Sequence, residues 1–170
     1  MANPPFRADH VGSLLRPPEL REARAKAREG ELPPAAVAEV ADRCIRAAVA
    51  KQEAIGLEAI TDGEFRRDWW HLDFLTGFDG VGLKASTQLK FQGVDEIPPT
   101  PTVTGRIRTT RPNMVGHFAF LKSATRKTAK FTCLSPQCGF ASTHHGNLLS
   151  FDEQWRKLER VVEVAREVWG

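Results

Sequence analysis

Several features are scarce or missing in this sequence, and each excludes a class of protein. No run of about 18 apolar residues occurs, so no membrane-spanning helix is expected. Three cysteines are too few, and odd in number, for a disulfide framework, which favours a reducing cytoplasm. The N-terminal stretch MANPPFRADH has no apolar signal core, so we expect no secretion. The net charge of +3 is small, and basic residues stand beside acidic ones, as in EARAKAREGE, so nucleic-acid binding is not expected.

The first half of the chain alternates short apolar runs with helical patterns. Residues 7–15 predict a strand, and the prolines that follow start a polar helix that Gly30 closes. A second helix is predicted over 33–55, with apolar residues at helical spacing along one face. Residues 57–61 predict the next strand. Strand, helices and strand in this order indicate an α/β fold with a parallel sheet.

The amino-acid composition changes between residues 77 and 112, where Gly, Pro and Thr are frequent. This region predicts a β-hairpin arm, with one strand over 84–93 and the other over 101–110. Residues 114–124 then predict a short helix.

The end of the chain carries a clear helical pattern. After a buried strand predicted over 129–134, Ser150 and Glu153 form an S-x-x-E capping box. The helix that it opens has an apolar stripe made of Trp155, Leu158, Val161, Val162, Ala165 and Val168.

Cysteines and histidines gather in FTCLSPQCGFASTHHGN, which raises the question of a metal site. A local zinc site of Cys133, Cys138 and His144 or His145 is one interpretation, because these side chains are zinc ligands. The simpler interpretation is that Cys133 is part of the core and both histidines are solvated. We favour the simpler one locally and keep Cys138, at a strand end, as the candidate ligand. Cys44 lies on an apolar helix stripe and is expected to be a core residue.

Two other stretches carry candidate binding groups. Asp62 and Glu64 follow a strand and could bind a cation or an ammonium group, or else cap a helix or pair with the arginines beside them. Gly12 and Ser13 offer backbone donors and a hydroxyl to a ligand, but a plain turn would have the same sequence. His10 is expected to be structural.

Taken together, these stretches resemble the cobalamin-independent methionine synthase family, in particular its short single-barrel forms. The resemblance rests on RADHVGSLLRPPEL, KQEAIGLEAITDGEFRRDWWHLDFLTGFDGV and LSPQCGFASTHHGN. It implies a TIM (β/α)8 barrel that transfers a methyl group from 5-methyltetrahydrofolate to the thiol of homocysteine, which zinc activates. Val11, Gly12 and Ser13 would hold the amino-acid part of homocysteine, Glu64 its ammonium group, and Cys138 the zinc.

The sequence departs from this family in the middle of the barrel. The family's His-x-Cys pair and distant glutamate, the other zinc ligands, have no match here. AKFT, which is similar to the third strand, runs directly into CLSPQCGF, which is similar to the eighth. We therefore expect a single incomplete barrel whose open sheet edges favour self-association. Its predicted parts are the first βα units (1–76), the β arm (77–112), a fused third and last strand region (113–149) and a C-terminal helix (150–170).

Two functions follow from this resemblance. The first is a zinc-dependent methyltransferase with homocysteine and methyltetrahydrofolate as substrates. The second is a catalytically inactive remnant that acts at most as a binding or interaction module. For this chain the second is physically favoured, because a catalytic zinc needs three protein ligands.

Overall fold

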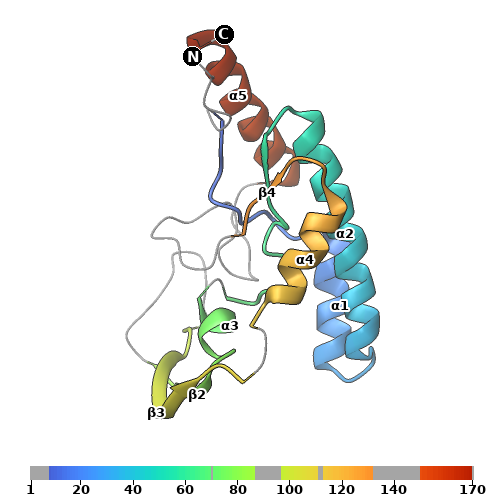
Figure 1. The fold of residues 1–170 in the computed structure, drawn as a ribbon. Coiled ribbons are helices and arrows are strands. Elements are labelled where there is room, and N and C mark those ends of the chain that lie inside the picture. Colours follow the sequence, from blue (N-terminus) through green and yellow to red (C-terminus); the bar gives the residue numbers. More distant parts are fainter. Residues whose placement is uncertain (1–7, 70, 87–96, 111–112, 132–149, 170) are drawn as a thin grey trace.

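The computed structural model describes residues 8–69, 71–86, 97–110, 113–131 and 150–169. Helices α1 (Pro18–Arg28) and α2 (Pro34–Ala54) lie side by side (Figure 1). Proline stands in the first turn of each helix, where its missing N–H has no cost. After α1, Gly30 has a φ of +78°, a left-handed conformation that favours glycine. Both predicted helices are confirmed within two residues at each end.

A parallel pair of short strands stands beside these helices. Strand β1 (Ala59–Ile60) pairs with β4 (Thr128–Ala129), with Ala59 opposite Thr128. Helix α4 (Val115–Ala124), which was predicted, precedes β4. The core lies between α2, β1, α4 and the C-terminal helix, and its large buried side chains include Leu14, Leu20, Ile45, Leu57, Ile60, Leu121 and Leu158. The described elements therefore form an α/β arrangement, as expected.

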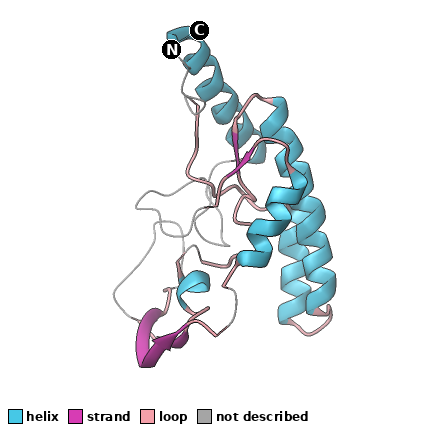
Figure 2. Ribbon diagram, viewed as in Figure 1, coloured by secondary structure: helices cyan, strands magenta, loops and turns pink. Residues whose placement is uncertain are grey.

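Strands β2 (Asp79–Lys84) and β3 (Thr100–Arg108) form an antiparallel pair, with α3 (Leu72–Leu75) just before it. Figures 1 and 2 show the pair standing apart from α1 and α2. Of the strand predicted over 84–93, only residues 84–86 are described; Lys84 ends β2, and residues 87–93 lie outside the described ranges. Strand β2 was not predicted because it contains glycines, which are not typical of strands. A Cβ on Gly80 would lie 2.6 Å from the backbone oxygen of Arg106, so this close pairing requires glycine.

Two other strand predictions need correction. The part of residues 7–15 that the structure describes contains no strand, because its backbone binds side chains and a loop in place of a neighbouring strand. The strand predicted over 129–134 is β4, which ends at Ala129; residues 132–134 lie outside the described part. The self-association expected from open sheet edges stays a prediction.

Helix α5 (Phe151–Trp169) begins at the predicted capping box. The Ser150 N–H donates to Glu153 Oε2 at 2.8 Å, and the Glu153 N–H donates to Ser150 Oγ at 3.2 Å. Trp155, Leu158 and Val162 of the stripe are buried, but the prediction for Val161 is wrong, since it is 41% exposed. No helix in the described ranges is long and apolar enough to cross a membrane.

Gly30 and Gly116 offer a matched pair of tests for this account of the helices. Gly30→Ala should lower the free energy of unfolding by about 1 kcal/mol, because alanine is strained at positive φ. Gly116→Ala, inside α4, should raise it by up to about 1 kcal/mol, because a Cβ there meets nothing within 4 Å. Urea unfolding measures both. Equal effects of the two substitutions would contradict the role given to Gly30.

Candidate functional site

Two sequence-distant stretches meet at the carboxyl end of β1. They are residues 10–16, the N-terminal segment, and residues 61–68, the β1 loop. The Leu14 N–H donates to the Gly63 oxygen at 3.0 Å, and Thr61 Oγ1 donates to the Gly12 oxygen at 2.9 Å. The structure thus brings Gly12 and Ser13 to the loop that carries Glu64. Ser13 and Glu64 are both almost fully buried, at 2% and 4% exposure.

A buried glutamine of α2 holds the start of the β1 loop. Gln52 Nε2 donates to the Thr61 oxygen at 2.9 Å, while Gln52 Oε1 accepts from the Thr61 N–H at 3.0 Å. Gln52 Oε1 also lies 3.1 Å from His10 Nε2. Because that oxygen can only accept, His10 Nε2 carries the proton. His10 is therefore held as a structural residue, and burial lowers its pKa.

Glu64 is a buried acidic residue of the β1 loop. Its backbone has a φ of +58°, and its N–H donates to Asp62 Oδ1 at 2.9 Å. Its Oε1 lies 3.4 Å from Arg67 Nη1, and its buried Oε2 has no hydrogen-bond partner within the described ranges. Burial raises the pKa of Glu64 to about 7, with Arg67 opposing the rise and Asp62 adding to it.

Arginine side chains fix the backbone of the same loop. Arg16 Nη2 donates to the backbone carbonyl oxygen of Glu64 at 3.1 Å and also to the backbone carbonyl oxygen of Arg67. Arg24 reaches the Arg67 oxygen at 3.1 Å and the Phe65 oxygen at 2.6 Å. The β1 loop is thereby held in its conformation without a helix or a strand of its own.

The partners expected for the two loop arginines are half correct. Arg67 does approach Glu64, and it also lies over the ring of Phe131 at 4.7 Å. Arg66 points away from the acidic residues of the loop and pairs with Asp42 of α2. The β1 loop therefore has an inner face with Glu64 and Arg67 and an outer face with Arg66.

Three residues that bind the backbone of these two stretches were missed by the sequence reasoning: Arg16, Gln52 and Gln154, whose Oε1 accepts from the Leu15 N–H. Gln52 lies at helical spacing from the buried Ile45, Ala48 and Val49 of α2, and such a polar residue on an apolar stripe was a detectable signal. Gln154 likewise precedes Leu158 by one turn on α5. Arg16 carries no comparable signal.

The described residues do not provide a zinc site. No group of three or more His, Cys, Asp or Glu residues among them is placed to hold a metal ion. Cys138, the predicted ligand, lies with Cys133, His144 and His145 outside the described ranges. Cys44 is a core residue as predicted; burial raises the pKa of its thiol to about 12, so it carries no thiolate at neutral pH.

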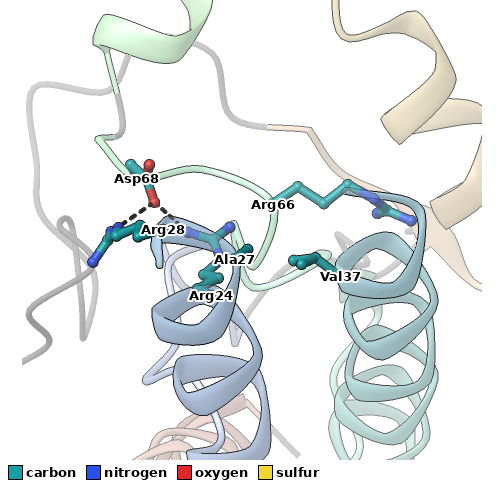
Figure 3. Close-up of a pocket in the computed structure, with 6 residues that line it drawn as sticks. All are labelled: Arg24, Ala27, Arg28, Val37, Arg66 and Asp68. Carbon is teal, nitrogen blue, oxygen red and sulfur yellow. Dashed lines mark hydrogen bonds and ion pairs between the residues drawn. The ribbon is translucent and has the colours of Figure 1, made fainter. Parts of the chain in front are cut away.

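A hollow of about 290 Å³ lies on the outer face of the β1 loop, against α1 and α2. Figure 3 shows Asp68 bridging Arg24 and Arg28, while Arg66 extends toward α2. Its charged groups are thus paired with one another or with Asp42. None of the predicted binding residues lines this hollow, so it is separate from the Glu64 site.

Known proteins are similar to most of this chain in sequence and in fold. The chain matches no protein-family profile. It is 41% identical over 138 residues to the uncharacterized protein YxjH of Bacillus subtilis, which covers 80% of this chain and 37% of YxjH. It is 29% identical over 133 residues to the 5-methyltetrahydropteroyltriglutamate–homocysteine methyltransferase of a Synechococcus strain, which covers 78% of this chain and 18% of that protein.

Two solved structures extend this comparison. A putative vitamin-B12-independent methionine synthase from Listeria monocytogenes superposes with a TM-score of 0.58 and 37% identity, over 74% of this chain and 35% of that one. A B12-independent methionine synthase from a Shewanella strain gives a TM-score of 0.60 at 18% identity, over 94% of this chain and 49% of that one. The chain thus spans well under half of the relatives that it resembles in sequence, and its α/β fold is consistent with part of their barrel.

The contribution of Glu64 to the free energy of unfolding should fall as pH rises from about 4.5 to about 7. The folded protein keeps the Glu64 proton up to a pKa of about 7, whereas the unfolded chain loses it near the ordinary value of 4.5. Glu64→Gln should remove this contribution, so that the variant gains on the order of 3 kcal/mol relative to wild type between pH 4 and 8.

Urea unfolding across this pH range measures the difference between the two proteins. The buried histidines contribute equally to both curves, so they cancel. Parallel stability curves would contradict the raised pKa of Glu64.

Proposed function

This chain belongs to the cobalamin-independent methionine synthase family, and from that premise we propose that residues 11–13 and Glu64 bind the amino-acid group of homocysteine. The observation that supports this most directly is the buried Glu64 carboxyl, whose Oε2 has no donor among the described residues. A buried carboxylate oxygen without a donor is costly, and a substrate ammonium would supply that donor and a further positive charge.

The N-terminal segment supplies the complementary groups in this proposal. Gly12 and Ser13 can offer backbone N–H groups and a hydroxyl to the substrate carboxylate, and their segment touches the β1 loop. Ammonium recognition by Glu64 and carboxylate recognition by residues 11–13 together select an α-amino acid. The side chain of the ligand then extends away from both groups.

We further propose that this chain binds homocysteine but does not by itself transfer a methyl group to it. The family's reaction needs a thiol activated by zinc, and the described residues do not form a site for that ion. The sequence contains no His-x-Cys pair, and Cys138 alone would be an incomplete ligand set. The alternative is the complete reaction, with methyltetrahydrofolate as donor and zinc held at Cys138.

The amino-acid proposal predicts a selective effect of Glu64→Gln. At pH 8 this substitution should weaken homocysteine binding at least about tenfold, because it removes the charge opposite the ammonium. Glu22→Gln is the matched control, since that carboxylate lies exposed on α1. Titration calorimetry measures both variants and wild type.

A second ligand makes this test specific for the ammonium group. 4-Mercaptobutyrate keeps the thiol and carboxylate of homocysteine but lacks the ammonium. It should bind wild type and Glu64→Gln with the same low affinity. Equal homocysteine affinity of wild type and Glu64→Gln would refute the role of Glu64.

The remaining prediction separates binding from catalysis. With methyltetrahydrofolate, homocysteine and added zinc, the purified chain should form no methionine above the enzyme-free rate. Metal analysis should find less than stoichiometric zinc, with no change in Cys138→Ala. Stoichiometric zinc that disappears in Cys138→Ala, together with methionine formation, would establish the complete reaction instead.

A further inference from the structure

Helix α5 places one polar side chain deep in the interior. Gln154 is 0% exposed, and its Oε1 accepts a hydrogen bond from the backbone N–H of Leu15, 139 residues earlier in the chain. A backbone N–H can only donate, so the amide must present its oxygen to Leu15. Gln154 Nε2 finds no acceptor within the described ranges.

This bond completes the support of the N-terminal segment. The N–H of Leu14 is bound by the Gly63 oxygen, and the oxygen of Gly12 is bound by Thr61 Oγ1, so these two contacts come from the β1 loop. The N–H of Leu15 is bound by α5. The segment that contains Gly12 and Ser13 is therefore held from two separate elements, although it belongs to no strand.

Packing alone gives no reason for a glutamine at this position. Its neighbours on the helix, Trp155 and Leu158, are buried apolar side chains, and an apolar residue would avoid burying an amide donor without an acceptor. The capping box at Ser150 and Glu153 fixes the first turn of α5, just before Gln154. The capping box thus fixes the helix turn that carries the Gln154 amide, and the amide binds the Leu15 N–H.

We propose that Gln154 is a positioning residue for the amino-acid site, because through Leu15 it fixes the N-terminal segment with Gly12 and Ser13 against the loop that carries Glu64. This inference rests on the proposed binding of homocysteine. Gln154 itself does not touch the ligand; it acts through the backbone of residues 12–15.

The test compares Gln154→Met with Val162→Ala, at a temperature where both variants are folded. Methionine keeps the length of the side chain but removes the acceptor, whereas Val162 is a buried residue of the same helix whose apolar side chain can accept no hydrogen bond. Gln154→Met should weaken homocysteine binding by about tenfold, the equivalent of one hydrogen bond. Val162→Ala should stay within about twofold of wild type even if it lowers the melting temperature as much.

Amide hydrogen exchange at Leu15, followed by NMR, gives a readout that does not need the ligand. Exchange should become faster in Gln154→Met and stay slow in Val162→Ala. Gln154→Glu, which retains an acceptor oxygen, should recover most of the affinity and of the protection.

The outcomes separate this inference from the proposed function. Failure of wild type to bind homocysteine would refute the proposed function and, with it, the positioning of an amino-acid site, whatever the exchange at Leu15. Normal binding with unchanged Leu15 exchange in Gln154→Met, or equal loss of affinity in Val162→Ala, would overturn the positioning role alone. If Gln154→Met and Gln154→Leu both failed to fold while Val162→Ala folded, Gln154 would be structural and the inference wrong.

Discussion

The side-chain amide of Gln52 satisfies the backbone of Thr61, the residue after β1, as a neighbouring strand would in a larger sheet. It donates to the oxygen of Thr61 and accepts from the N–H of the same residue, so one side chain satisfies both backbone groups. Strand β1 is only two residues long, and among the described residues it pairs with β4 alone, so its own ladder ends before the β1 loop begins. Thr61 Oγ1 in turn donates to the Gly12 backbone oxygen, and Gln52 Oε1 also accepts from His10 Nε2. The arrangement of the whole site depends on this buried amide.

Much of the helical framework could be predicted because its signals are local. Prolines in first turns, Gly30 after α1 and the capping box at Ser150 act within a few residues of where they stand. The strands were harder, because their boundaries depend on partners far away in sequence: β2 was overlooked because Gly80 is required by a backbone across the pair. Val161 was misassigned because Val162, one residue later, takes the core-facing position.

The same difference between local and long-range signals applies to the residues of the candidate site. The resemblance picked out the stretches with Gly12, Ser13 and Glu64, and the structure brings these stretches together. It gave no indication of Gln52, Gln154 or Arg16, whose roles arise only when segments up to 139 residues apart meet. Family membership does not by itself assign an activity, because chemistry depends on the complete set of groups at a site. Here the residues proposed to bind the amino-acid group lie within the described ranges, and a set of zinc ligands does not.

The bond between Leu15 and Gln154 also has a consequence for the order of folding. Its two ends are separated by 139 residues, so the ribosome must add these residues before the bond can form. Helices α1 and α2 need only local contacts and can form early, whereas the segment between His10 and Arg16 must wait for α5. The N-terminal segment therefore completes its hydrogen bonds only after α5 has been synthesised, and the bonded Leu15 N–H indicates that this helix has docked.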